Sequence, residues 1–160
     1  MFGVQMKRLA AIAVLGGLAA CAQVPEKKVE LPEPAPRCQP AAAGHPLIGN
    51  WLGTRKASGM TGELKVWLQL KADGTMVYSE QLQRRRKPPQ SLSEDGCWRI
   101  EAQTLVLQTL NSNGVPVELD DPIYTNRYSV VSQNQRNLRL RGSEGEFNVG
   151  RMPDTYRLPF

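Results

Sequence analysis

The sequence predicts an all-β domain, an antiparallel up-and-down barrel of about eight strands, which follows a signal peptide and a proline-rich tether. From residue 47 onward, short runs of alternating apolar and polar residues are separated by turn-forming residues, a spacing typical of barrels and sandwiches. No segment shows a convincing helical period. The chain therefore divides into a leader (residues 1–20), a tether (21–43) and the barrel (44–160), with a two-sheet sandwich as the alternative fold.

The leader has the order of features found in a bacterial export signal. Lys7 and Arg8 precede the apolar run Leu9–Leu18, which is too short to span a bilayer comfortably. The next residues, Leu18-Ala19-Ala20-Cys21, resemble the lipobox of bacterial lipoproteins. This resemblance implies cleavage before Cys21, diacylglycerol on its thiol and an acyl chain such as palmitate on the new amino terminus. Two or more acyl chains anchor a protein stably, so membrane lipid is the expected partner of Cys21.

The residue after the cysteine bears on location. Ala22 stands where an Asp would retain an enterobacterial lipoprotein at the inner membrane. We therefore expect an outer-membrane lipoprotein whose domain faces the periplasm. The alternative is an uncleaved apolar helix with a free, buried cysteine.

The segment before the barrel is expected to be a spacer. It has little apolar content and cannot bury enough surface to fold, and its prolines favour extended polyproline geometry. These prolines are Pro25, Pro32, Pro34, Pro36 and Pro40.

Eight strands are expected in the barrel domain. In the second, Leu64, Val66, Leu68 and Leu70 alternate with polar residues or Trp, and Asp73-Gly74 then predicts a hairpin turn. The connections after strands one, three and five are long, and alternate connections of such a barrel lie at the same end, so one mouth should carry long loops. The runs are residues 47–56, 63–71, 75–83, 96–101, 104–110, 123–131, 136–141 and 146–151, and the long connections are 57–62, 84–95 and 111–122.

One short motif carries a family resemblance. Gly49-Asn50-Trp51 matches the Gly-x-Trp motif of lipocalins and their calycin relatives, so the domain resembles the compact lipocalin-like domains of small bacterial lipoproteins. The resemblance implies that Trp51 closes the base of the barrel and that a basic side chain near the end of the last strand packs over it. A guanidinium stacks well on an indole face. Arg151 is the first candidate, with Arg139 and Arg141 as rivals.

Two cysteines remain after lipidation, Cys38 and Cys97. In the oxidising periplasm they are expected either to form a disulfide between the tether and the fourth strand or to stay as independent thiols.

Charge is concentrated in two loops. The net charge is +5, and removal of residues 1–20 with Lys7 and Arg8 leaves +3, without the basic stripe and interleaved aromatics of a nucleic-acid binder. We therefore expect no nucleic-acid partner. The basic run could pair with the acidic loop, bind an anionic envelope partner or remain a solvated run. The basic run is Arg84, Arg85, Arg86 and Lys87, and the acidic loop carries Glu118, Asp120 and Asp121.

Catalysis and metal binding have little support. His45 is the only histidine, no Gly-x-Ser-x-Gly occurs, and no cysteine or carboxylate cluster has metal-ligand spacing. Asp120 and Asp121 are interpreted as turn formers. No enzyme activity, metal or cofactor is expected.

Two functions remain open. The first is a binding module that holds a small apolar or amphipathic ligand in the mouth of the barrel. The second is an envelope interaction protein, such as an enzyme inhibitor or assembly factor, with long loops on a solidly packed barrel. The sequence does not decide whether the interior is hollow, because a small barrel can be filled by its own side chains.

Overall fold

The computed structural model describes residues 36–56, 59 and 61–159. Unless stated otherwise, every contact below lies within this described part. Within these residues, nine strands and one short 3-10 helix, η1, follow one another along the chain. Their bounds are β1 Gly49–Arg55, β2 Glu63–Leu70, β3 Thr75–Gln83, β4 Gln90–Glu101, β5 Thr104–Ser112, β6 Val115–Pro116, η1 Pro122–Tyr124, β7 Thr125–Gln133, β8 Asn137–Gly142 and β9 Gly145–Met152.

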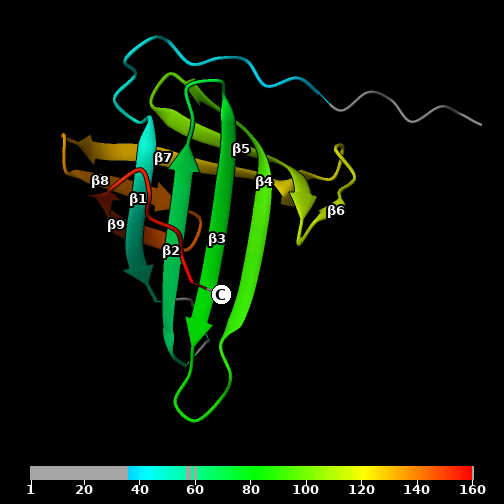
Figure 1. Cartoon of the computed structure of the whole chain (residues 1–160), viewed down its shortest axis with the longest axis vertical. Coiled ribbons are helices and arrows are strands. Elements are labelled where there is room, and N and C mark those ends of the chain that lie inside the picture. The colour runs from blue at the N-terminus through cyan, green and yellow to red at the C-terminus, as the bar shows by residue number, and fades with distance from the viewer. Residues whose placement is uncertain (1–35, 57–58, 60, 160) are drawn as a thin grey trace, which may run out of the picture. The chain divides into compact units, whose positions relative to one another are not determined.

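The sheet closes on itself. Its order is β4-β3-β2-β1-β9-β8-β7-β5, and a β4–β5 pairing completes an eight-stranded antiparallel ring (Figure 1). The two-residue β6 is a short addition to the edge of β5. Each strand of the ring pairs with its neighbours in sequence, and β9 returns to β1, so the up-and-down barrel predicted from the sequence is confirmed.

The largest departure from the expected strands is at the start of β4. This strand begins at Gln90 rather than at Gly96, and Gln90 already pairs with Leu82 of β3. The expected long connection between β3 and β4 is therefore a tight hairpin of residues 84–89 at the end of an extended ladder.

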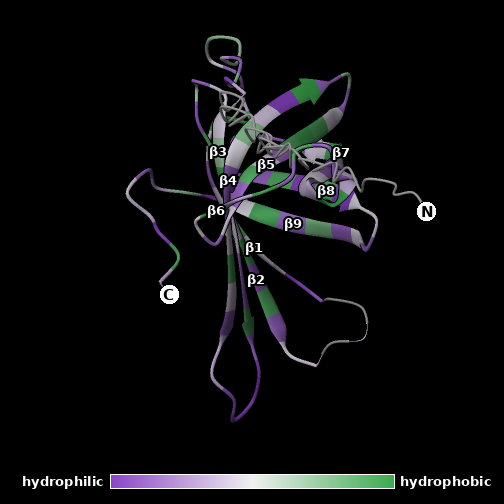
Figure 2. Ribbon diagram, turned by 90° about the vertical axis from the view of Figure 1, so that its right-hand side faces the viewer, coloured by the Kyte–Doolittle hydropathy of each residue, from purple (hydrophilic) through white to green (hydrophobic). Residues whose placement is uncertain are grey.

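The core fills one end of the barrel, which we call the base. Alternate residues of the strands point inward, and Figure 2 shows the resulting alternation of hydropathy along β9. Trp51, Leu68, Leu105, Leu138 and Val149 are all at most 2% exposed and belong to one apolar cluster. Burial of such side chains is the main source of stability for a domain of this size.

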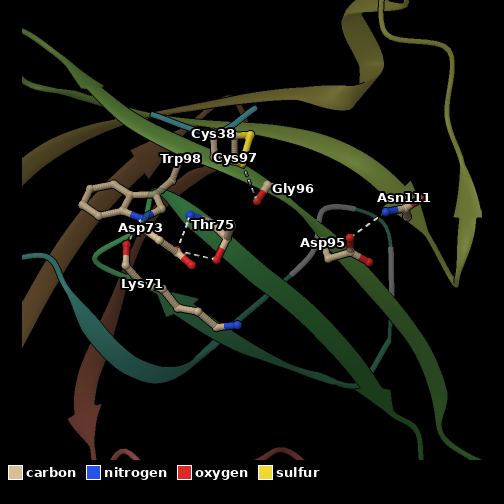
Figure 3. The surroundings of a disulfide bond; sticks show 9 residues. All are labelled: Cys38, Lys71, Asp73, Thr75, Asp95, Gly96, Cys97, Trp98 and Asn111. Carbon is tan, nitrogen blue, oxygen red and sulfur yellow. Dashed lines mark hydrogen bonds between the residues drawn. A yellow bond between two sulfur atoms is a disulfide. The ribbon is translucent and has the colours of Figure 1, made fainter. Parts of the chain in front are cut away.

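The segment before β1 lies against this end. Cys38 and Cys97 form a disulfide (Figure 3), which settles the alternative left open by the sequence. Ala41 donates its backbone N–H to the carbonyl of Ala72 and packs on the core. Residues 38–43, expected to be tether, are thus attached to the barrel.

The residues after β9 run along the outside of the barrel. Gln81 donates a hydrogen bond to the carbonyl of Pro159, and Asn50 donates one to that of Pro153. Leu158 is buried, and the guanidinium of Arg157 lies 5.8 Å from the ring centroid of the outward-facing Trp67. This terminal segment therefore covers an indole that would otherwise be exposed.

No helix within the described residues is long and apolar enough to cross a membrane.

Candidate ligand-binding cavity

A cavity of about 760 Å³ occupies the end of the barrel opposite the base, and we call this end the mouth. The connections after β1, β5 and β8 border it, as alternate connections of an up-and-down barrel should. Its lining combines ionisable and aromatic side chains. The principal members are Arg55, Tyr78, Glu80, Leu92, Glu94, Tyr124, Tyr128, Glu144 and Phe147.

The strand period explains why charged groups reach the interior. Trp51, Gly53 and Arg55 share the inward face of β1, where they pair in register with Leu68, Val66 and Leu64. On β3, Tyr78 and Glu80 follow the buried Met76 in the same way. The inward face therefore changes from apolar at the base to ionisable near the mouth.

Arg55 is the centre of an ion-pair network. Its Nη2 lies 2.5 Å from a carboxylate oxygen of Glu80, and its Nη1 pairs with Glu144 in the β8–β9 turn. The hydroxyl of Tyr78 also donates to Glu80. Burial opposes the charge of Arg55, but the hydrogen bond with Glu80 and nearby negative charge keep the pKa of the guanidinium above its ordinary value. Its Nε is buried without a hydrogen-bond partner among the described residues.

Glu94 lies on the neighbouring strand β4, in register with Tyr78, where it lines the cavity and is 8% exposed. One carboxylate oxygen accepts a hydrogen bond from the Thr109 hydroxyl at 3.1 Å. Burial raises the pKa of Glu94, the Thr109 bond opposes that change, and the charge of Glu80 adds to it. A carboxylate so placed is costly unless a partner compensates its charge.

A β-bulge lies close to Glu94. The register of β4 against β5 shifts between Asp95 and Gly96, one residue after Glu94. A Cβ at Gly96 would lie 2.0 Å from the carbonyl oxygen of Gln108, so only glycine allows the two strands to approach here.

Aromatic rings line the other side. Tyr128 and Phe147 meet edge to face with their centroids 5.6 Å apart. Burial raises the pKa values of Tyr78 and Tyr128, so both phenols stay neutral at physiological pH. A Cβ at Gly142 would lie 2.9 Å from the Tyr128 ring, so this glycine makes room for the ring.

The residues of the Gly-x-Trp motif lie at the base, away from the cavity. The guanidinium carbon of Arg151 is 4.1 Å from the ring centroid of Trp51, whose Nε1 donates to the carbonyl of Leu47 at 2.9 Å. Arg151 also donates to the carbonyls of Pro46, Ile48 and Gln135. Its rivals Arg139 and Arg141 instead pair with Glu146.

The charged loop residues that were singled out from the sequence do not line the cavity. Arg84, Arg85, Arg86 and Lys87 lie in the tight β3–β4 hairpin, where Arg84 bonds to the Gln90 side chain. No ion pair joins them to the acidic loop in the described part of the chain. Asp121 caps η1 by accepting from the N–H of Ile123, whereas Glu118 and Asp120 are exposed.

Two further expectations concern metal and lipid. No group of three or more potential metal ligands occurs among the described residues. Cys21 and the leader lie outside them, so lipidation stays a prediction.

Sequence reasoning missed the ionisable part of the cavity, namely Arg55, Glu80 and Glu94. The signal was present in the strand period. Counting back in twos from Trp98 leads to Gly96, Glu94 and Leu92, all inward, but the polar character of residues 90–95 predicts a loop.

Comparison with known proteins adds one structural likeness. Neither a family model nor a curated protein matches this chain. Among solved structures, the chain is similar to the lipoprotein YedD from Klebsiella pneumoniae subsp. pneumoniae, with 16% sequence identity, a TM-score of 0.42, and coverage of 79% of this chain and 83% of that one. A likeness at this level assigns no function.

Proposed function

We propose that this protein is a lipid-anchored binding protein of the bacterial envelope, whose lipocalin-like barrel holds a small amphipathic ligand in its mouth. The observation that carries the proposal is the cavity of about 760 Å³, which lies in the range of ligand pockets and is open at the mouth. Its apolar floor and its few placed polar groups are the combination that gives small-molecule sites both affinity and orientation.

The anchor and location in this proposal rest on the sequence. Cys21 would carry the lipid, and Ala22 favours the outer membrane with the barrel in the periplasm. Binding rather than catalysis is proposed because the ionisable groups of the cavity, Arg55 and Glu80 above all, are engaged with one another.

Native mass spectrometry tests the proposal. A form that begins at Ala22, and so lacks the lipidated Cys21, would be secreted into the periplasm of its own host behind a conventional signal peptide, purified gently and weighed intact. A bound small molecule of defined mass is the expected result. A matched variant with Gly142→Phe would displace the Tyr128 ring, which lines the cavity, and should release that mass. Ligand-free protein from several growth conditions would contradict the proposal.

One observation favours a second candidate, an envelope interaction protein such as an enzyme inhibitor or assembly factor. The connection after β5 exposes three large apolar side chains, Val115, Leu119 and Ile123, at 64%, 46% and 71%. Exposed apolar groups at a loop are typical of protein contacts. Since Ile123 also lines the cavity, the clean test is Val115→Ser with Leu119→Ser, which should abolish co-purification of a partner without releasing a bound small molecule.

A further inference from the structure

The carboxylates of the cavity differ in their partners. Glu80 and Glu144 pair with Arg55, and Glu146 pairs with Arg139 and Arg141 outside the cavity. Glu94 has no ion pair among the described residues, and the Thr109 hydroxyl is its side-chain partner. A carboxylate that is 8% exposed therefore faces the cavity with unused acceptor capacity.

The cations of the cavity do not compensate this charge. Arg55 is already shared by two carboxylates, and Arg127 pairs with Glu101 at 2.7 Å. Lys56 is exposed at the rim. The interior thus has an excess of negative charge, which disfavours an anionic ligand. The free Nε of Arg55 suits a neutral acceptor such as a hydroxyl or carbonyl oxygen.

The rings around this charge add a second attraction. Tyr78, Tyr128 and Phe147 are all less than 10% exposed and line the same cavity as Glu94, and the guanidinium of Arg55 already lies 5.9 Å from the ring centroid of Phe147. The negative faces of aromatic rings attract cations, most strongly where water is excluded. A carboxylate and several rings around one space is an arrangement that recognises ammonium groups.

We propose that the cavity takes an organic cation, a ligand whose ammonium group pairs with Glu94 and whose apolar part contacts Tyr128 and Phe147. This inference rests on the proposed ligand-binding function and names its ligand class. An ammonium paired with Glu94 forms charge-assisted hydrogen bonds and compensates a charge that the protein otherwise holds alone.

The test uses the full-length protein in maltoside micelles and three probes that share one tail. These are 2-phenylethylammonium, 2-phenylethanol and 3-phenylpropanoate, titrated calorimetrically at pH 7. The cation should bind about tenfold more tightly than the neutral alcohol, as expected for one charge-assisted pair, and the anion most weakly. E94Q should reduce the affinity for the cation to that for the alcohol. The matched control E63Q removes an exposed carboxylate that does not line the cavity and should change neither affinity.

Each outcome is decisive. Tightest binding of the anion would make Arg55 the recognition group and overturn the inference, as would equal binding of all three probes or no binding of any. The order of the probes on the wild-type chain decides the question even if E94Q fails to fold. The proposed function is judged separately. A small molecule with a neutral or anionic head, recovered by native mass spectrometry, would refute the proposed cationic ligand but would support the proposed ligand-binding function.

Discussion

The two ends of this barrel use the same strands for opposite purposes. At the base, Trp51 is fully buried, its indole N–H is satisfied by Leu47, and Arg151 covers its ring. At the mouth, Glu94 and the Nε of Arg55 are buried with unused hydrogen-bonding capacity. The base contributes stability, whereas the mouth holds polar groups at a cost that a bound ligand would offset. Truncation of the base should therefore destabilise the protein, whereas removal of the charge of Glu94 at the mouth should stabilise it.

Truncation of the base should have the largest effect. Trp51→Ala removes a fully buried indole and leaves Arg151 without its ring, so we expect a loss of about 4 kcal/mol in the free energy of unfolding. The matched change Tyr124→Ala removes a half-exposed ring at the mouth and should cost less than about 1 kcal/mol. Urea denaturation of both variants measures the difference, and equal losses would refute the division into two ends.

Removal of the disulfide should cause the next largest loss in the free energy of unfolding. Replacing Cys38 and Cys97 together by Ala opens a crosslink between residues 59 apart in sequence and should cost about 3 kcal/mol. The unfolded state gains conformational freedom, so the midpoint of thermal unfolding should fall while ligand binding at the mouth is retained. If binding were lost with the fold intact, the two ends would be coupled.

A substitution at Gly49, with a smaller expected effect on stability, tests how closely the residues of the base pack together. Gly49 has φ +138°, and a Cβ there would lie 2.3 Å from Nη1 of Arg151. Gly49→Ala should therefore cost about 2 kcal/mol, through backbone strain and displacement of the guanidinium. The control Gly49→Ala with Arg151→Ala relieves the clash but not the strain, so the two changes should not be additive. Additive losses in thermal unfolding would show that the contact is unimportant.

The smallest predicted effect is a gain, not a loss, in the free energy of unfolding. Burial, reinforced by Glu80 and opposed by Thr109, raises the pKa of Glu94 above its ordinary value of 4.5. A raised folded-state pKa means that the contribution of Glu94 to stability is present below pH 4.5 and is lost as the pH rises through the higher value of the folded state. Glu94→Gln should thus stabilise the ligand-free protein by about 1 kcal/mol at pH 7 and by almost nothing at pH 3.5.

Denaturation at both pH values measures this change. The control is Glu63→Gln, an exposed carboxylate at the start of β2, which should leave stability unchanged at either pH. A gain for Glu94→Gln that persists at pH 3.5 would arise from packing rather than from charge. In that case, electrostatic interactions with Arg55, Glu80 and Tyr78 would not explain the gain in stability.

The two ends also differ in how far the sequence predicts them. The base follows from strict alternation of large apolar residues, so the closed ring and the inward position of Trp51 are accessible to pattern reasoning. At the mouth the inward positions carry Arg55, Glu80 and Glu94, which remove the apolar signal on which the pattern depends. The period of β4 itself continues without a break from Trp98 back to Leu92, but polar residues fill most of positions 90–95, so the pattern predicts a loop there.

The disulfide also determines how the barrel would respond to mechanical tension. A pull on the chain before Cys38 passes through the sulfur bridge into Cys97, in the middle of the β3–β4–β5 region of the closed sheet. Residues 39–96, which include β1, β2 and β3, lie within the covalent loop, so the load reaches these strands through the sheet and not along their own backbone. A domain held this way cannot be peeled open strand by strand from its amino-terminal end, so tension on the tether would act on the sheet as a whole.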